Sequence, residues 1–372
     1  MTLTDFLAQE HFLLPKYQSP KQDFKLFIFK LLDVFVEKLS QLEPEGYFED
    51  MPEFSISLIR ERQIQLVSRI KEAIDSSYDG RPSKAYNALD KGLMNNLKDF
   101  SEVLNIIDIP AETNFYRIRI HKENYPLPND NFFHIPFNLR GKVKTQRFSI
   151  PGFPSLYLGN SIYVCWEELK RPNTSDFQAV RLKSTTTIKI IDLSPPPEGL
   201  IPRQLYRYLM TWPLVLASSV KVREHEDAFK PEYIIPQLLL QWVREKQEVD
   251  GIAYQTTNID YRTSLSEGRF TNIVLPVKEN KIRGLCEVLK SKFEITDVIS
   301  HQLSQLAFGS GNFTYTHDEI NSLNSNIKYI EFIKGKKSIY GYSILGDLER
   351  QLNSMVTERI PNQEANEMPR SD

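Results

Sequence analysis

Apolar residues recur at helical spacing through the first hundred residues of the chain. Residues 21–43 carry apolar side chains every three or four positions, at Phe24, Phe27, Ile28, Leu31, Leu32, Phe35 and Leu39. A second helical run has Ile59, Leu66, Val67, Ile70 and Ile74, and the Asp79-Gly80 turn with Pro82 predicts its end. A third short helix is expected over about 83–98. Residues 1–108 are therefore expected to form an α-helical extension. Its first helix has an apolar arc wide enough to need cover on more than one side.

From about residue 113 the pattern changes to short β-type segments separated by loops and helices. The predicted strands are 114–120, 155–159, 179–183, 186–193, 251–255 and 271–277. Helices are expected at about 201–217, 232–246 and 344–356. This mixture predicts an α+β fold. Residues 281–360 are expected to form a C-terminal α/β extension packed on the rest, and the polar tail 361–372 is expected to be disordered.

The charge and composition of the chain exclude several functional classes. Among 372 residues, 46 Lys and Arg balance 48 Asp and Glu, which gives no general attraction to nucleic acid or to an anionic membrane. The two cysteines offer neither a disulfide framework nor metal-binding spacing. The chain shows no signal peptide and no apolar run near the roughly 20 residues of a membrane helix. We therefore expect a soluble, cytoplasmic protein without a metal site.

Arginines are the first candidates for chemistry. Arg117 and Arg119 lie two residues apart in the 114–120 strand, so they share one face. Arg147 follows in a Gln-Arg-Phe-Ser turn. A guanidinium group offers a planar fork of donors that fits phosphate oxygens. The alternative is a solvated outer face of the sheet, and the third arginine weakens that alternative.

The second group of candidates comes from residues 155–168. Ser155 and Tyr157 share one face of a short strand, and Asn160 or Ser161 can cap the helix that follows. On this helix the apolar stripe is predicted to be Ile162, Cys165, Trp166 and Leu169. Glu167 is expected to point away from the stripe. Glu168 is expected at its edge, partly buried, where it could meet a ligand. The alternative is that both glutamates are solvated.

These residues together resemble the RES domain, a family named for its arginine, glutamate and serine. The family's first-strand Tyr-Arg matches Tyr116-Arg117, and its Gly-Arg-Trp/Phe-Asn turn matches residues 146–149. Its Tyr-Leu strand end matches Tyr157-Leu158, and its glutamate, eleven residues after that tyrosine, matches Glu168. The turn lacks the family's first glycine and last asparagine. The family serine has no counterpart in 229–243, where Gln237 is the nearest polar residue. Ser218 and Ser219, upstream, are the other candidates.

The resemblance covers about residues 109–280, and it implies a catalytic domain there with an ADP-ribosyltransferase-like mixed β core and flanking helices. It implies NAD⁺ as a substrate and no separate cofactor, with the nicotinamide–ribose bond broken by phosphorolysis or hydrolysis, as in NAD⁺-depleting bacterial toxins. The catalytic residues would be Glu168, Arg117 and Tyr157. The residues that bind NAD⁺ would be Arg147, Tyr116, Arg119 and Gln237. The acceptor, whether water, phosphate or a macromolecule, is left open.

Two other functions stay open on the same residues. One is an ADP-ribosyltransferase that modifies a macromolecule, and the other is an NAD-binding module without catalysis, for which the missing serine is the hint. Small members of the family are held in check by an antitoxin. An antitoxin or a regulatory protein is therefore an expected class of partner, and self-association is left open. For the helical extension, packing on the catalytic domain is preferred over a sensing role.

Overall fold

The computed structural model describes residues 6, 9–10, 13–42, 56–94, 104–123, 125–196, 202–260, 266–308 and 327–360. The predicted disordered tail, 361–372, and residues 95–98 of the third predicted helix lie outside these residues. The chain divides into two compact units that interleave in sequence. Unit 1 comprises residues 1–107, 146–149 and 189–264, and unit 2 comprises 108–145, 150–188 and 265–372.

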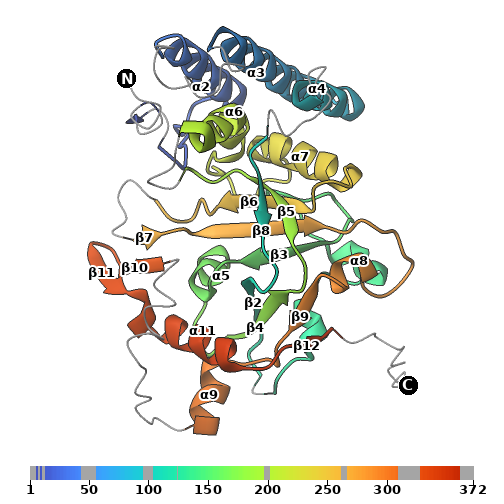
Figure 1. Ribbon diagram of the computed structural model, residues 1–372, viewed down its shortest axis with the longest axis vertical. Coiled ribbons are helices and arrows are strands. Elements are labelled where there is room, and N and C mark those ends of the chain that lie inside the picture. Colours follow the sequence, from blue (N-terminus) through green and yellow to red (C-terminus); the bar gives the residue numbers. More distant parts are fainter. Residues whose placement is uncertain are drawn as a thin grey trace. The chain divides into compact units, whose positions relative to one another are not determined.

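Unit 1 is mainly helical. Its helices are α2 (Phe24–Leu39), α3 (Ile56–Tyr78), α4 (Pro82–Met94), α6 (Pro202–Ser218), η5 (Pro231–Tyr233) and α7 (Ile234–Glu245). In Figure 1 the blue helices α2–α4 lie above α6 and α7, and α2 contacts both α3 and α6 while α4 contacts α7. Phe24, Ile28, Leu32, Phe35 and Leu39 are buried, which confirms the helix predicted in 21–43 and its apolar stripe.

The strands of unit 1 form a small parallel pair. In this pair β5 (Ile188–Asp192) lies beside β6 (Gly251–Gln255), with Ile190 opposite Gly251. Helix α7 packs on β6. The strand β1 (Ile106–Ile109) lies where the chain passes from unit 1 to unit 2. Trp212 of α6 and Trp242 of α7 are among the largest fully buried side chains, so these two helices supply much of the core.

Unit 2 is built on antiparallel strands in the order β8-β3-β2-β4-β9-β12. Their bounds are β2 (Asn114–Ile120), β3 (Ser155–Gly159), β4 (Phe177–Ser184), β8 (Thr271–Pro276), β9 (Phe293–Ile295) and β12 (Glu358–Arg359). β2 pairs with β4 over its whole length, and β3 does the same with β8. β2 and β3, by contrast, share a single pair, Tyr116 opposite Gly159. The two strands are therefore not held in register beyond that point.

A smaller sheet and short helices complete unit 2. The sheet has the order β11-β10-β7, with β11 (Lys336–Ile339), β10 (Ile327–Ile333) and β7 (Glu267–Gly268). The helices are η3 (Asn129–Phe132), η4 (Phe137–Lys142), α5 (Ile162–Glu168), α8 (Glu287–Lys290), α9 (His301–Phe308), η6 (Tyr340–Tyr342) and α11 (Ile344–Ser354). Parallel and antiparallel pairs thus occur together with helices, and the predicted α+β class is confirmed.

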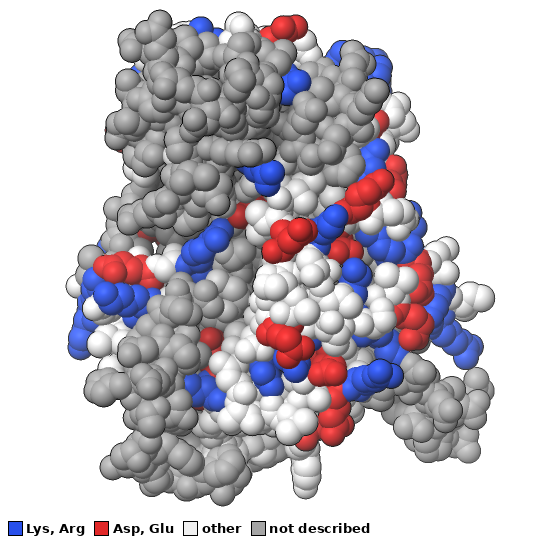
Figure 2. All heavy atoms as spheres, in the orientation of Figure 1, with Lys and Arg blue, Asp and Glu red and all other residues white. Residues whose placement is uncertain are grey.

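On the face in Figure 2, acidic and basic side chains of the described residues are interspersed. None of the helices that the structure describes has both the length and the apolar character needed to cross a bilayer.

Candidate active site

Arg117 lies in the middle of β2, opposite Val180 of β4. Strand alternation places it with Phe115 and Arg119 on one face, and with Tyr116 on the other. Its Nη1 is buried and has no hydrogen-bond partner among the residues that the structure describes. Burial, together with the positive charge of Arg119, lowers the pKa of Arg117 to about 9. A buried, charged N–H group without a hydrogen-bond partner is costly, so Nη1 of Arg117 is suited to meet an anion.

His134 lies within electrostatic reach of Arg117, but it brings no negative charge. Its ring is buried, its Nε2 accepts a hydrogen bond from Cys286 N at 2.8 Å, and its Nδ1 lies 2.8 Å from the Ile135 carbonyl oxygen. The first bond requires an unprotonated Nε2, so Nδ1 carries the proton and donates a hydrogen bond to the Ile135 carbonyl oxygen. Burial lowers the pKa of His134 to about 4. The imidazole is therefore neutral and structural at physiological pH.

Tyr157 lies in β3, opposite Val274 of β8. Burial raises its pKa above the ordinary value, and the Arg117 guanidinium and the Ser155 hydroxyl partly offset this effect. Arg117 and Tyr157 each change the pKa of the other, so the two side chains lie within electrostatic reach. β2 and β3 share only the pair Tyr116–Gly159, so the alternation along one strand does not fix the face of side chains on the other.

Glu168 ends α5, the short helix that follows β3. The Ser161 hydroxyl accepts a hydrogen bond from Val164 N at 3.1 Å, which confirms one of the two predicted caps. The helix sits tightly on the end of β3, because a Cβ atom at Gly159 would lie 2.7 Å from Cys165 Sγ. Glu168 Oε1 accepts a hydrogen bond from Asn272 Nδ2 at 2.6 Å. Asn272 is buried and lies opposite Gly159 in the β3–β8 ladder.

The predicted arrangement of the two glutamates on α5 is wrong. Glu167 is the buried one, with 4% of its surface exposed, whereas Glu168 is exposed. The helix is covered on more sides than one apolar stripe requires, since Tyr163 and Val164 are buried as well. Glu167 tolerates burial because Arg171 binds it at 2.8 Å. Glu168 therefore faces solvent, and Asn272 orients its carboxylate.

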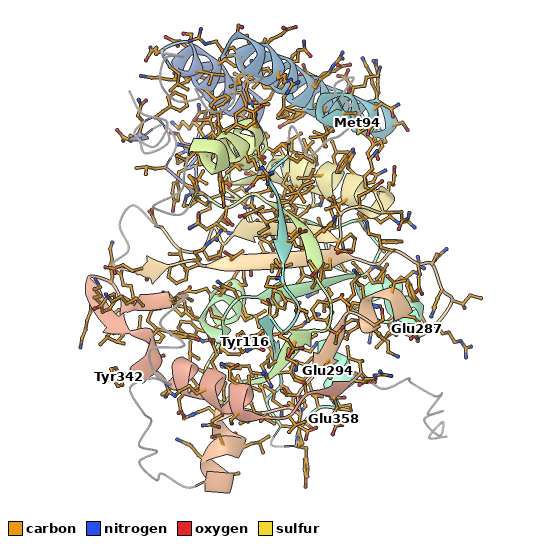
Figure 3. All side chains as sticks on the ribbon, in the orientation of Figure 1. Met94, Tyr116, Glu287, Glu294, Tyr342 and Glu358 are labelled. Atoms are coloured by element: carbon orange, nitrogen blue, oxygen red, sulfur yellow. The ribbon has the colours of Figure 1, made fainter. Side chains whose placement is uncertain are left out.

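Tyr116 and Arg119 complete the candidates of unit 2. Tyr116, labelled in Figure 3, is buried, and its hydroxyl donates a hydrogen bond to Asn353 Oδ1 of α11 at 2.6 Å. This hydroxyl has a structural partner, and its predicted role in binding NAD⁺ stays a prediction. Arg119 is less buried than Arg117, and burial lowers its pKa too. Its predicted contact with the substrate also stays a prediction.

Arg147 and Gln237 belong to unit 1. Arg147 lies in the turn formed by residues 146–149, and Gln237 binds that turn from α7. Arg147 Nη1 donates to the carbonyl oxygens of Ser218 and Val220, at 2.8 and 2.9 Å. Gln237 Nε2 donates to the Gln146 carbonyl oxygen at 3.1 Å. The Ser218 hydroxyl is buried and has no hydrogen-bond partner among the described residues. The structure thus brings Arg147 and Gln237 together with one of the two upstream serines.

Sequence reasoning missed Asn272. Its interaction with Glu168 spans more than a hundred residues of sequence, so local periodicity carries no trace of the pair. The signal that was present is a polar residue near the start of an otherwise apolar strand, TNIVLP. Buried amides in such positions usually have a specific hydrogen-bond partner.

Comparisons with known proteins show the family to which the chain belongs. The model of the RES domain family matches residues 114–278, which contain all seven of the predicted site residues. A protein of Bacillus subtilis (strain 168), described as "Putative toxin YopC", is 34% identical over 319 residues, covering 78% of this chain and 69% of that protein. No solved structure matches. The chain belongs to the RES domain family, and the resemblance predicted from its sequence is confirmed.

Proposed function

We propose that the chain is an enzyme that cleaves the nicotinamide–ribose bond of NAD⁺ and acts as a toxin or defence effector by depleting it. Membership of the RES domain family supports an NAD-related activity, and the description of the Bacillus subtilis relative as a toxin supports the biological role. The observation that carries the proposal is the buried Nη1 of Arg117, which has no hydrogen-bond partner among the described residues. A pyrophosphate would supply the missing negative charge.

The chemistry asks little of the protein beyond binding and electrostatics. The bond between the nicotinamide nitrogen and the ribose C1″ breaks, and its electron pair leaves with nicotinamide, which becomes neutral. The ribose passes through an oxocarbenium-like state, as in glycoside hydrolysis. An acceptor oxygen from water or phosphate then bonds to C1″ and releases its proton to solvent. The leaving group needs no general acid, so charge stabilisation is the main task.

The described residues are suited to three parts of that task. Arg117, with Arg119 near it, would neutralise the pyrophosphate. Tyr157, within electrostatic reach of Arg117, would pack beside the nicotinamide ring. Glu168, oriented by its hydrogen bond from Asn272, would stabilise the developing positive charge on the ribose. Arg147 and Gln237 stay predicted ligands of NAD⁺.

The direct test is incubation of the purified chain with NAD⁺, with and without inorganic phosphate, followed by chromatography. We expect release of nicotinamide, with ADP-ribose as the co-product of hydrolysis or its 1″-phosphate as that of phosphorolysis. Intact NAD⁺ after long incubation with folded, partner-free protein would refute the proposal. Turnover only with a protein or nucleic acid present would indicate an ADP-ribosyltransferase instead. Binding without turnover would indicate a non-catalytic module.

Glu168→Gln tests the assigned carboxylate. The substitution removes the charge but keeps the shape and the acceptor for Asn272, so kcat should fall by roughly 10²–10³ while the fold is retained. Glu167 is unsuitable as the control, because it is buried in an ion pair. Glu358, an exposed glutamate of β12 labelled in Figure 3, is the matched control. Equal kinetics in Glu168→Gln and Glu358→Gln would remove Glu168 from the mechanism.

A further inference from the structure

Helix α5, which carries Glu168, is too short to be stable by itself. It spans the seven residues Ile162–Glu168, and isolated helices shorter than about 12 residues are marginal in water. Its order must therefore come from tertiary partners. Many of those partners lie in residues 327–354, beyond the 114–278 segment that matches the RES domain. We call this segment, which comprises β10, β11, η6 and α11, the C-terminal clamp.

The clamp holds the N-terminal end of α5 through Glu349 of α11. Glu349 Oε2 accepts a hydrogen bond from Ile162 N at 2.8 Å, and the Tyr340 hydroxyl donates to the same oxygen at 2.5 Å. An acceptor oxygen at this end satisfies a first-turn N–H group, and the ionised form of the side chain also complements the helix dipole. η6 and α11 are fitted closely, since a Cβ atom at Gly346 would lie 2.3 Å from the Tyr340 carbonyl oxygen.

Glu349 is fully enclosed by groups from several elements. Burial raises its pKa to about 7, and the bonds from Tyr340 and Ile162, with the charge of Arg350, partly offset that effect. Two further titratable groups face it, namely Tyr116 of β2 and Cys165 of α5. Both are neutral at physiological pH, because burial raises the pKa of each. Glu349 is thus the one acidic group that these contacts place at the start of α5.

The clamp also holds the C-terminal end of α5. Just beyond the helix, Lys170 and Arg171 have positive φ, and the Arg171 side chain binds Glu167. Besides its ion pair with Glu167, Arg171 donates to the carbonyl oxygens of Phe332 and Glu331 in β10, at 2.9 and 3.1 Å. The Phe332 ring packs edge-on against Trp166 of the helix, with ring centroids 5.7 Å apart. Both ends and one side of α5 therefore rest on the same segment.

From this arrangement we infer that the C-terminal clamp is a working part of the active site, and that Glu349 is a positioning residue which sets the place of Glu168 through the N-terminal end of α5. The inference rests on the proposed function, in which Glu168 stabilises the ribose cation. It assigns a role in the reaction to a segment outside the matched RES domain. Loss of Glu349 should move the helix, and with it the carboxylate of Glu168. Glu349 therefore acts through α5 rather than by contact with the substrate.

The test compares Glu349→Ala with Glu349→Gln in the full chain, with Glu358→Gln as the control. We expect Glu349→Ala to lower kcat for nicotinamide release by about 10–100-fold and to leave KM nearly unchanged, because small misplacements of a catalytic group act on the transition state. Glu349→Gln keeps an acceptor oxygen for Ile162 N and should restore most of the rate. In a Glu168→Gln background, Glu349→Ala should cause no further loss. An equal loss in both backgrounds would overturn the inference.

Hydrogen exchange separates a failure of the inference from a failure of the proposed function. We expect faster exchange in the peptide that contains α5 in Glu349→Ala, and unchanged exchange in the peptide that contains β4. If the unmodified chain does not consume NAD⁺ but this difference is found, the proposed function fails and the clamp on α5 stands. If exchange in α5 is unchanged by Glu349→Ala, the positioning role is refuted whatever the activity.

Discussion

Replacing Arg117 by methionine should stabilise the free chain and abolish its response to NAD⁺. The pKa of Arg117 falls from 12.5 to about 9 in the folded chain, chiefly because of burial. One pKa unit corresponds to about 1.4 kcal/mol, so keeping this side chain charged costs the folded state at most about 5 kcal/mol. Local relaxation reduces such costs, and replacing buried ion pairs by apolar residues of similar volume is often neutral or stabilising by about 1–4 kcal/mol. We expect a gain in that range.

The lowered pKa of Arg117 predicts that its replacement stabilises the folded chain. The folded pKa lies below the unfolded one, so the charged form is disfavoured by folding. The cost is therefore fully present at all pH values below about 9, and it disappears only as the pH rises toward 12.5. At pH 7 the arginine destabilises the free protein, and only a bound anion can offset this. Methionine is unbranched and flexible, so it can fill much of the same volume.

The assay is urea denaturation at pH 7, with the NAD⁺ response measured as a thermal shift in a Glu168→Gln background that prevents consumption. NAD⁺ at 100 times its Kd should add about 2.7 kcal/mol to the stability of the Arg117 protein. The methionine variant should be more stable without NAD⁺ and should show no shift with it. Arg119→Met is the control and should change both quantities less, because Arg119 is less buried. A variant at Arg117 that is no more stable and still responds to NAD⁺ would refute the reasoning.

Three further outcomes are expected. Arg147→Lys should lower kcat/KM for NAD⁺ although the charge is kept, because lysine lacks the bidentate fork; unchanged kinetics would place the pyrophosphate elsewhere. Glu349 has a pKa of about 7 in the folded chain against 4.5 ordinarily, so its contribution to stability falls as pH rises from about 4.5 to about 7. In Glu349→Gln the midpoint of urea denaturation should therefore vary less with pH between about 4.5 and about 7. A midpoint that depends on pH as strongly as in the unmodified chain would contradict this. Deleting residues 1–108 should give a protein that aggregates in size-exclusion chromatography, because α2–α4 cover apolar surface of α6 and α7. A truncated chain that is soluble and more active would show instead that the helical extension is a detachable inhibitor.

Local pattern predicted the elements of the fold well. The strands expected at 114–120, 155–159 and 251–255 are found at those residues, because alternation and apolar runs reflect burial within one element. The helices expected at about 201–217 and 232–246 are found at Pro202–Ser218 and Ile234–Glu245 for the same reason. The cap at Ser161 was within reach of sequence reasoning because its hydrogen bond spans three residues.

The parts of the site that local pattern could not predict depend on partners far along the chain. Glu167 looks solvated until Arg171 is fixed against β10, which lies about 160 residues later. Glu349 contacts Ile162 across 187 residues of sequence, and no periodicity connects the two. The lowered pKa of Arg117 likewise depends on its burial and on the nearby charge of Arg119, and the burial is a property of the assembled unit rather than of its own strand.

The position of the clamp outside the matched RES domain has a consequence for comparing relatives. A chain that keeps the core around Gly159 and Glu168 but lacks a counterpart of α11 must order the same seven-residue helix by other means. The family would then contain at least two architectures, distinguished by whether a glutamate far downstream caps this helix. In this chain the close fit of α5 on β3 requires glycine at position 159, because a Cβ atom there would meet Cys165 Sγ. A survey of relatives for a glutamate at the position of Glu349, rather than for the catalytic residues alone, would separate the two groups.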